Sequence, residues 1–226
     1  MIWEYVYNTE FVAFKDCYLS GCGGYCCDIS KDFSIISSIT LPLLEEEYNY
    51  YRQKGGIQNI NDFKKEEFIL QNGKKFTLYY LICNCKGLCN PHSMRPLICR
   101  IYPFIPKVSF KGECEGFLYA SLFDVIYNDL NHPCTLAREN KEEIFTTLQE
   151  KLKPLLLKPK LIFAFKTIEI LYTHLLSRLN LNEDLSKCNK RLEFLLLSRK
   201  AWKSEAFKHE ISQAYEEIAK NFGDFL

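Results

Sequence analysis

The most constraining feature of this sequence is the grouping of its cysteines. Eight of the eleven cysteines fall in two short windows, which residues 28–82 separate. The first window contains Cys17, Cys22, Cys26 and Cys27, and the second contains Cys83, Cys85, Cys89 and Cys99. Cysteines grouped so closely are typical of metal ligation or redox chemistry rather than of packing. We therefore expect a cysteine-bound metal centre, mononuclear or clustered, around which the fold is built.

Length, charge and the N-terminal sequence limit the class of protein. With 226 residues, 47% of them hydrophobic, the chain can bury a core without disulfides. Its formal net charge of +1 gives no basic surface for nucleic acid, so no nucleic-acid partner is predicted. The sequence starts with acidic rather than basic residues and has no apolar run long enough for a membrane span. We expect a cytoplasmic protein without membrane contact, whose cysteines are not in disulfides.

Local patterns predict the elements around the two windows. Residues 1–16 alternate aromatic and polar side chains, which predicts a strand or extended arm. Glycines within 17–27 suit a loop that brings several sulfurs to one point. Apolar residues at helical spacing predict a helix over 38–52, with Pro42 in its first turn. An Asn72-Gly73 turn between two apolar runs predicts a β-hairpin that leads directly into the second window.

The C-terminal part has a different character. From about residue 140, apolar side chains repeat every three or four residues, with breaks at 154–159, 180–184 and 200–204. The predicted fold is α+β and mainly α. Residues 1–135 are expected to form a cysteine-rich, metal-organised half with a short β-hairpin, and residues 136–226 a helical bundle that packs on it.

The residues of the second window resemble a known family. They contain Cys89, five residues, Arg95-Pro96, two residues, Cys99-Arg100, one residue and then Tyr-Pro-Phe. This pattern matches that of a cysteine-cluster family described as zinc- or iron-chelating domains. The first window is more similar to the related flagellin lysine N-methylase branch. The resemblance covers residues 17 to about 117. It implies a set of metal ligands made up of Cys17, Cys22, Cys26, Cys27, Cys83, Cys89, Cys99 and Cys114, with Cys85 as an alternative to Cys83.

Other residues near the windows have two interpretations each. Arg95 and Arg100 flank Cys99 and could hold thiolates by charge and hydrogen bonding, as cofactor-binding residues, or could be surface arginines. His92 and His132 could each ligate a metal or be hydrogen-bonded side chains. Adjacent Cys26 and Cys27 could serve two metals, or one could ligate while the other packs. Cys134 and Cys188 are predicted to be small buried hydrophobes.

Two classes of function are consistent with these observations. The first is a metal-binding protein with an iron–sulfur or zinc centre, and the glycine-rich loop and the arginines slightly favour iron–sulfur. The second is an enzyme. The resemblance to the methylase implies methylation of a protein substrate with S-adenosylmethionine, and an iron–sulfur oxidoreductase is a further alternative. No glycine-rich strand-to-helix loop for that methyl donor and no Ser-His-Asp arrangement stand out, so no catalytic residue is predicted.

Overall fold

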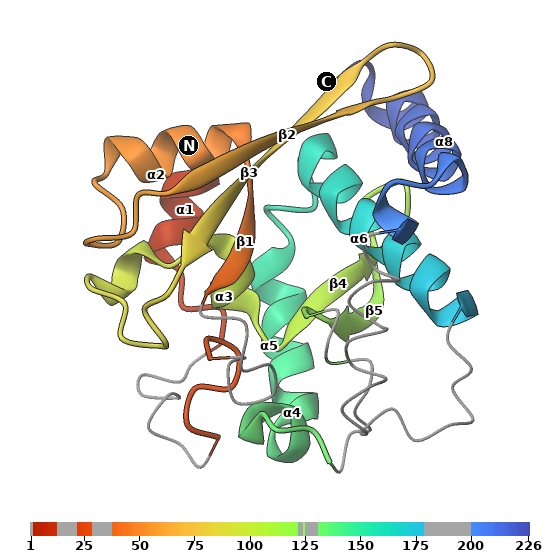
Figure 1. Cartoon of the computed structure of the whole chain (residues 1–226). Coiled ribbons are helices and arrows are strands. Elements are labelled where there is room, and N and C mark those ends of the chain that lie inside the picture. Colours follow the sequence, from red (N-terminus) through yellow and green to blue (C-terminus); the bar gives the residue numbers. More distant parts are fainter. Residues whose placement is uncertain (1, 13–21, 29–37, 122–123, 125–130, 179–199) are drawn as a thin grey trace.

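The computed structural model describes residues 2–12, 22–28, 38–121, 124, 131–178 and 200–226 (Figure 1). Within these residues the chain is an α+β protein in which helix predominates, as predicted. The helices are α1 (Ile2–Asn8), α2 (Glu45–Gln53), the 3-10 helix η3 (His92–Met94), α3 (Leu97–Ile101), α4 (Thr135–Glu139), α5 (Lys141–Leu152), α6 (Pro159–Arg178) and α8 (Glu205–Phe222). The strands are β1 (Ile39–Leu44), β2 (Phe63–Ile69), β3 (Lys75–Cys83), β4 (Phe104–Val108) and β5 (Cys114–Tyr119).

The predicted hairpin is present as β2 and β3 of a three-stranded antiparallel sheet with strand order β1-β3-β2. Its turn contains Gly73 with a φ of 83°, a left-handed conformation that glycine adopts without strain. The Asn72 side chain supports this turn by accepting a hydrogen bond from Lys74 N at 3.0 Å. The last residue of β3 is Cys83, so the central strand carries the chain directly into the second cysteine window.

The predicted helix over 38–52 is wrong in its first half. Residues Ile39–Leu44 form β1, which pairs with β3 in a register that places Leu41 opposite Leu81. The helix begins only at Glu45, and the three glutamates of its first turn stand where negative charge is favourable. Pro42 lies in an edge strand of the sheet, which is where proline is usually found in sheets. Pairing with β3 therefore outweighed the local helical spacing.

The predicted strand or arm at the N-terminus is also wrong, because residues Ile2–Asn8 form α1. Trp3, Val6 and Tyr7 are spaced three and four residues apart, and all three are buried on one side of this helix. The pattern of aromatic and polar residues that suggested a strand thus belongs to a short helix with one buried face. The Tyr5 hydroxyl donates to Lys151 O of α5 at 2.9 Å, which ties α1 to the C-terminal part.

The C-terminal part is helical, as its apolar pattern predicts. Helix α8 begins after Ser204, whose Oγ accepts a hydrogen bond from Phe207 N at 3.1 Å and so caps the helix. The break predicted at 180–184 and the apolar run that follows it lie outside the described residues. No helix in the described ranges combines the length and the apolar character that a membrane span requires.

The C-terminal helices pack against the hairpin. The rings of Phe76 on β3 and Phe163 on α6 have centroids 4.9 Å apart, and those of Phe68 on β2 and Trp202 have centroids 4.8 Å apart. Figure 1 shows the far end of the hairpin reaching α8. Buried residues of both parts belong to one hydrophobic cluster, so residues before and after position 136 share a core.

Candidate metal centre

Three sulfurs of the second window meet just beyond the end of β3. The Sγ atom of Cys85 lies 3.0 Å from that of Cys83 and 3.1 Å from that of Cys89. The chain reverses between these cysteines because Lys86 and Gly87 both adopt positive φ angles, of 49° and 89°. Two successive residues in this conformation form the tight turn that joins antiparallel segments.

Cys99 comes from α3, whose first turn is held by a residue that the sequence analysis missed. Glu47 of α2 is only 2% exposed, and its Oε1 accepts a hydrogen bond from Leu97 N at 2.7 Å. Burial raises the pKa of this carboxyl to about 7. Glu47 is the last of three consecutive glutamates, a pattern typical of a solvated helix start, so the sequence carried no signal that one of them would be buried.

The described part of the first window belongs to the turn 22–28, which lies against the second window. Within this turn, Cys27 N donates to Gly24 O at 2.9 Å. Asp28 Oδ2, at the end of this turn, lies 3.5 Å from Nζ of Lys86 in the second window. The Sγ atoms of the adjacent Cys26 and Cys27 are 3.6 Å apart. Cys17 lies outside the described residues.

The thiols are close enough to influence one another by charge. Burial is the main cause that raises the pKa of Cys99, and the charges of Cys27 and Cys83 add to the increase. A hydrogen bond with Cys85 is the largest cause that raises the pKa of Cys83, followed by burial. Several thiolates in one buried place repel each other. A positive ion among these sulfurs would relieve that repulsion.

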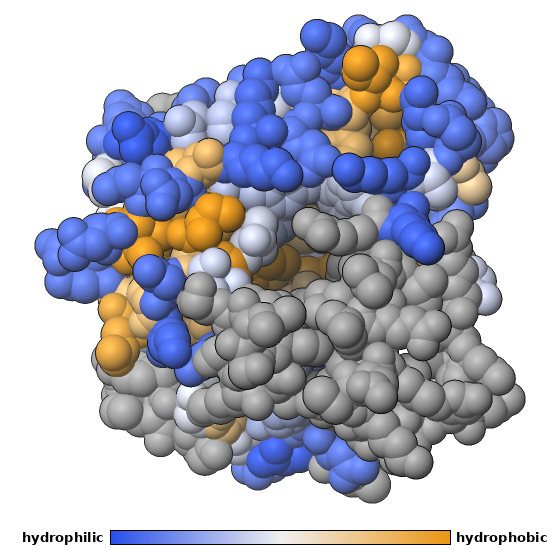
Figure 2. All heavy atoms as spheres, viewed as in Figure 1, coloured by the Kyte–Doolittle hydropathy of each residue, from blue (hydrophilic) through white to orange (hydrophobic). Residues whose placement is uncertain are grey.

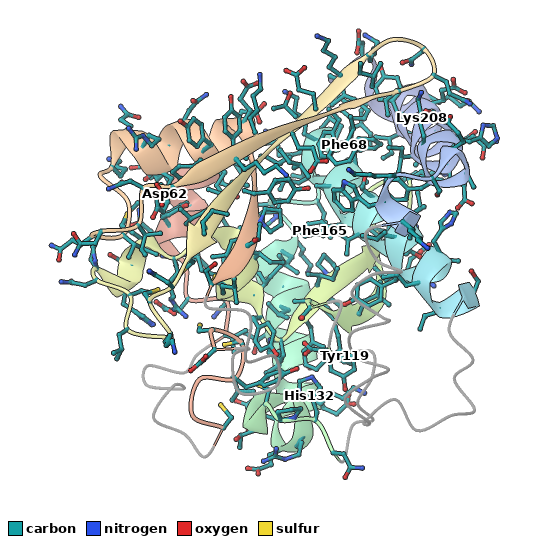
Figure 3. The ribbon with its side chains drawn as sticks, viewed as in Figure 1. Asp62, Phe68, Tyr119, His132, Phe165 and Lys208 are labelled. Carbon is teal, nitrogen blue, oxygen red and sulfur yellow. The ribbon has the colours of Figure 1, made fainter. Side chains whose placement is uncertain are left out.

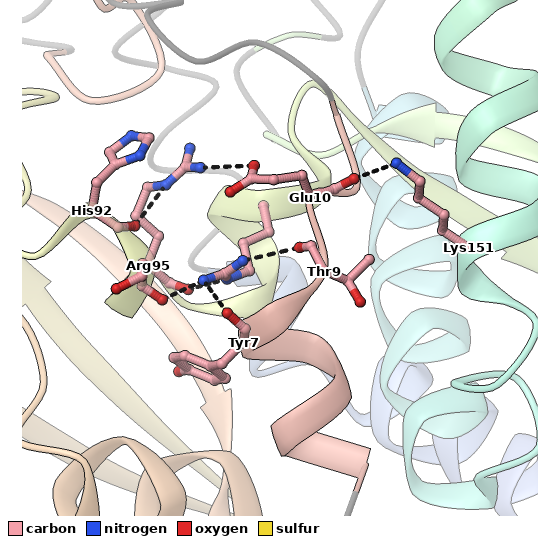
Figure 4. Close-up of polar contacts among 8 residues, drawn as sticks. Tyr7, Thr9, Glu10, His92, Arg95 and Lys151 are labelled. Atoms are coloured by element: carbon pink, nitrogen blue, oxygen red, sulfur yellow. Dashed lines mark hydrogen bonds and ion pairs between the residues drawn. The ribbon is translucent and has the colours of Figure 1, made fainter.

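Arg95 supplies positive charge at this place. A hydrogen bond with Cys26 is the largest cause that lowers the pKa of Cys27, and the charge of Arg95 lowers it further. The Arg95 side chain is held from two sides (Figure 4). Its Nε donates to His92 O at 3.2 Å, and its Nη2 lies 3.7 Å from Oε2 of Glu10. This hydrogen bond and this ion pair join Arg95 to His92 and Glu10, and its predicted role in holding thiolates stays a prediction.

Arg100 has a different role from the one predicted. Its guanidinium is 3% exposed and donates to the carbonyl oxygens of Arg95 at 2.8 Å, Tyr7 at 3.0 Å and Thr9 at 3.0 Å, and also to that of Ser93 (Figure 4). These bonds join the end of α1 to the segment before α3. Arg100 therefore positions the helix that carries Cys99, with its guanidinium directed to backbone oxygens rather than to sulfur.

The structure does not bring Cys114 to the other thiols. Cys114 begins β5 opposite Val108, and its Sγ donates to Gly116 O at 3.5 Å within its own strand. Strand pairing with β4 fixes this place, since the Cys-Glu-Gly segment continues straight into β5. The ligand role that the resemblance implied for Cys114 has no support from its position.

His132 is a hydrogen-bonded core histidine. It is fully buried, its ring stacks on Tyr119 with centroids 4.7 Å apart (Figure 3), and its Nδ1 accepts a hydrogen bond from Cys134 N at 3.0 Å. A neutral ring that accepts at Nδ1 carries its proton on Nε2, which faces Asp124 Oδ1 at 3.5 Å. Neither nitrogen then offers a lone pair to a metal. Cys134 is 5% exposed, in keeping with a small buried side chain.

A cavity of about 770 Å³ adjoins the thiols. Its walls include apolar side chains of the β1-β3 face and of α6 together with seven cysteines, namely Cys22, Cys26, Cys27, Cys83, Cys89, Cys99 and Cys134. Figure 2 shows apolar atoms in a recess beside the hydrophilic side chains of the hairpin. Cys85 does not line this cavity, although its sulfur contacts two that do.

The sulfur spacing was compared with what a metal requires. In the described ranges no three His, Cys, Asp or Glu side chains already have the arrangement that holds a metal ion. Tetrahedral zinc binds sulfur at about 2.3 Å, which places neighbouring sulfurs roughly 3.8 Å apart. The Cys85 sulfur lies 3.0 Å from that of Cys83 and 3.1 Å from that of Cys89, closer than two sulfurs bound to one zinc ion. The soft donor set fits zinc or iron.

Comparisons with protein-family models, with curated proteins and with solved structures found no match to this chain.

Proposed function

We propose that this chain is a metal-binding protein with a buried, cysteine-ligated zinc or iron centre. The observation that carries the proposal is the convergence of thiols from three separate segments, namely the turn 22–28, the end of β3 with its following turn, and α3. A closed thiolate site needs about four sulfurs from separate loops. Residues that bring so many thiols together without disulfides serve ligation better than packing.

The best candidates for the ligands are Cys27, Cys83, Cys89 and Cys99. All four line the cavity, as Cys22 and Cys26 also do, and the charges of Cys27 and Cys83 reach Cys99. This choice favours Cys83 over Cys85 at the position that the sequence left open. Arg95 would offset part of the negative charge of four thiolates around a divalent ion. Arg100 and Glu47 would hold α3, and therefore Cys99, in place.

The spacing of the sulfurs supports a single ion more than a cluster. The thiolates of a four-iron cluster each bind a different iron, so their sulfurs stand far apart. The sulfurs of the proposed ligands Cys83 and Cys89 both touch that of Cys85, at 3.0 and 3.1 Å, so both lie near one point, as the ligands of one tetrahedral ion do. We therefore favour zinc or a single iron here, in place of the slight preference for iron–sulfur that the sequence indicated.

The experiment that tests this function is elemental analysis of protein purified without oxygen. We expect about one equivalent of zinc or iron per chain or more, with a visible absorption band only if the metal is iron. Broad absorption together with acid-labile sulfide would indicate a cluster instead. Protein that carries no metal and takes up neither zinc nor ferrous iron on titration would contradict the proposal.

The enzyme hypothesis remains the second candidate because of the cavity beside the thiols. Its volume of about 770 Å³ falls in the range of about 300–1,000 Å³ that is usual for small-molecule sites. The resemblance to flagellin lysine N-methylase would assign S-adenosylmethionine and a protein lysine to such a site. An iron–sulfur oxidoreductase would instead need a cluster, which the sulfur spacing favours less.

A calorimetric titration with S-adenosylmethionine separates the two candidates. The control is a mutant in which Ala164 on the cavity wall is replaced by tryptophan, whose bulky ring would fill the cavity. If the protein is a metal-binding module, we expect the wild type to give no more binding heat than this mutant. Saturable binding to the wild type that this substitution abolishes would favour the methyltransferase. Heat that is equal in both proteins would come from outside the cavity.

A further inference from the structure

Cys85 is a fifth thiol beside the four that we propose as ligands. Its sulfur touches those of Cys83 and Cys89, at 3.0 and 3.1 Å, yet it does not line the cavity. A tetrahedral ion has room for four sulfurs. If Cys27, Cys83, Cys89 and Cys99 bind the metal, Cys85 is left in contact with two ligands and is itself not needed as one.

Of the three sulfurs that touch here, those of Cys85 and Cys89 are the ones that solvent can reach. Cys83 is 3% exposed, whereas Cys85 and Cys89 are both partly exposed. Leu88, between them, is 70% exposed. A dissolved oxidant would therefore meet these two sulfurs before the buried one.

The backbone also brings these two cysteines together. Leu88 N donates to Cys85 O at 2.8 Å, which closes the turn that contains Lys86 and Gly87. Lys86 has a φ of 49°, an unfavourable angle for a residue with a Cβ. Such strain is found where the surrounding structure requires a particular chain path. Here that path places the two sulfurs in contact across four residues.

We propose that Cys85 and Cys89 are a reversible oxidation site at which hydrogen peroxide forms a disulfide and withdraws Cys89 from the metal. The sulfur of Cys89 attacks one peroxide oxygen, the O–O bond breaks, and a sulfenic acid and water form. The Cys85 sulfur then attacks the sulfenic sulfur, the S–O bond breaks, and the hydroxyl leaves as a second water once the Cys85 proton is transferred. Two thiols are oxidised, one peroxide is reduced, and a dithiol reductant restores both.

This inference rests on the proposed function in one respect, because it assigns Cys89 to the metal and Cys85 to the disulfide. With one ligand withdrawn, three thiolates remain and the metal is held much less tightly. Oxidation at the exposed turn would then control metal occupancy in the buried site.

The test treats zinc-loaded protein with hydrogen peroxide and follows zinc release with a chromogenic chelator. We expect the wild type to release zinc and to gain a Cys85–Cys89 disulfide, detected by mass spectrometry of peptides. The Cys85→Ser mutant should still bind zinc but release it at least about tenfold more slowly, since a sulfenic acid at Cys89 then lacks the thiol that touches it at 3.1 Å. Cys114→Ser is the matched control, because Cys114 lies on β5 away from this group, and it should behave as the wild type.

The proposal would be overturned if peroxide left zinc bound, if Cys85→Ser released zinc as fast as the wild type, or if the disulfide joined other cysteines. These failures leave zinc binding itself intact and so differ from failure of the proposed function. Protein that never binds metal would refute that function, whereas a Cys85–Cys89 disulfide formed in it would still support the oxidation site. Peptide mapping of the wild type needs no folded mutant.

Discussion

Replacing Cys99 by serine is expected to abolish metal binding and to destabilise the protein strongly. Cys99 is the only thiol that α3 contributes. Burial raises its pKa, and the charges of Cys27 and Cys83 raise it further, so it lies near these two thiols. Loss of one of four ligands should leave less than about a tenth of the wild-type metal content. Metal present at about 1,000 times its dissociation constant stabilises a protein by about 4 kcal/mol, so a loss of this size is expected in urea unfolding.

The matched control for this prediction is Cys114→Ser. Both cysteines are partly exposed, but the Cys114 thiol donates to Gly116 O in β5 and does not line the cavity. We expect the control to keep its metal and most of its stability. Equal metal content in the two mutants would show that Cys99 is not a ligand. Unfolding measured with and without a chelator would separate lost metal from damaged packing.

Replacing Arg100 by leucine is expected to give the second large effect. We expect the free energy of unfolding to fall by about 3–5 kcal/mol, as is usual when a buried charged group is removed from its partners. The substitution leaves carbonyl oxygens of residues 7, 9, 93 and 95 without their donor. Unsatisfied buried acceptors destabilise the folded state. Because these bonds position α3, metal affinity should fall together with stability.

Arg52→Leu serves as the control for the arginine substitution, since Arg52 is exposed in the last turn of α2. We expect it to unfold at nearly the wild-type denaturant concentration. If Arg100→Leu behaved in the same way, the buried guanidinium would not be the connection between α1 and α3. If it lost metal without losing stability, Arg100 would act at the thiols after all, as the sequence suggested.

The two predictions address different parts of one arrangement. Cys99 would contribute a ligand, while Arg100 and Glu47 hold the helix that presents it. Glu47 on α2 and Arg100 on α3 both bond to backbone groups near the start of α3. A buried thiolate site needs such support because each ligand must keep its direction when the metal binds.

Local sequence signals determined a substantial part of this protein. The Asn72-Gly73 dipeptide was enough to predict the hairpin, since a tight turn depends on the conformations of the residues within it. The periodic leucines and isoleucines predicted α5, α6 and α8, because an amphipathic helix carries its own pattern. Cysteine grouping likewise indicated which thiols to consider.

Only the tertiary structure decided the rest. Residues 39–44 have helical spacing but form β1, because β3 offered a partner for strand pairing that no local pattern reveals. Arg100 and Glu47 looked like a thiol-binding arginine and a solvated glutamate, and their buried bonds depend on residues about 90 and 50 positions away. The position of the turn at Lys86 and Gly87 against the turn 22–28 likewise decides which sulfurs line the cavity. Cys85 is not among them. Contacts between distant segments decide which side chains are buried and where they point, whereas a sequence pattern reflects only the properties of residues that are close in the chain.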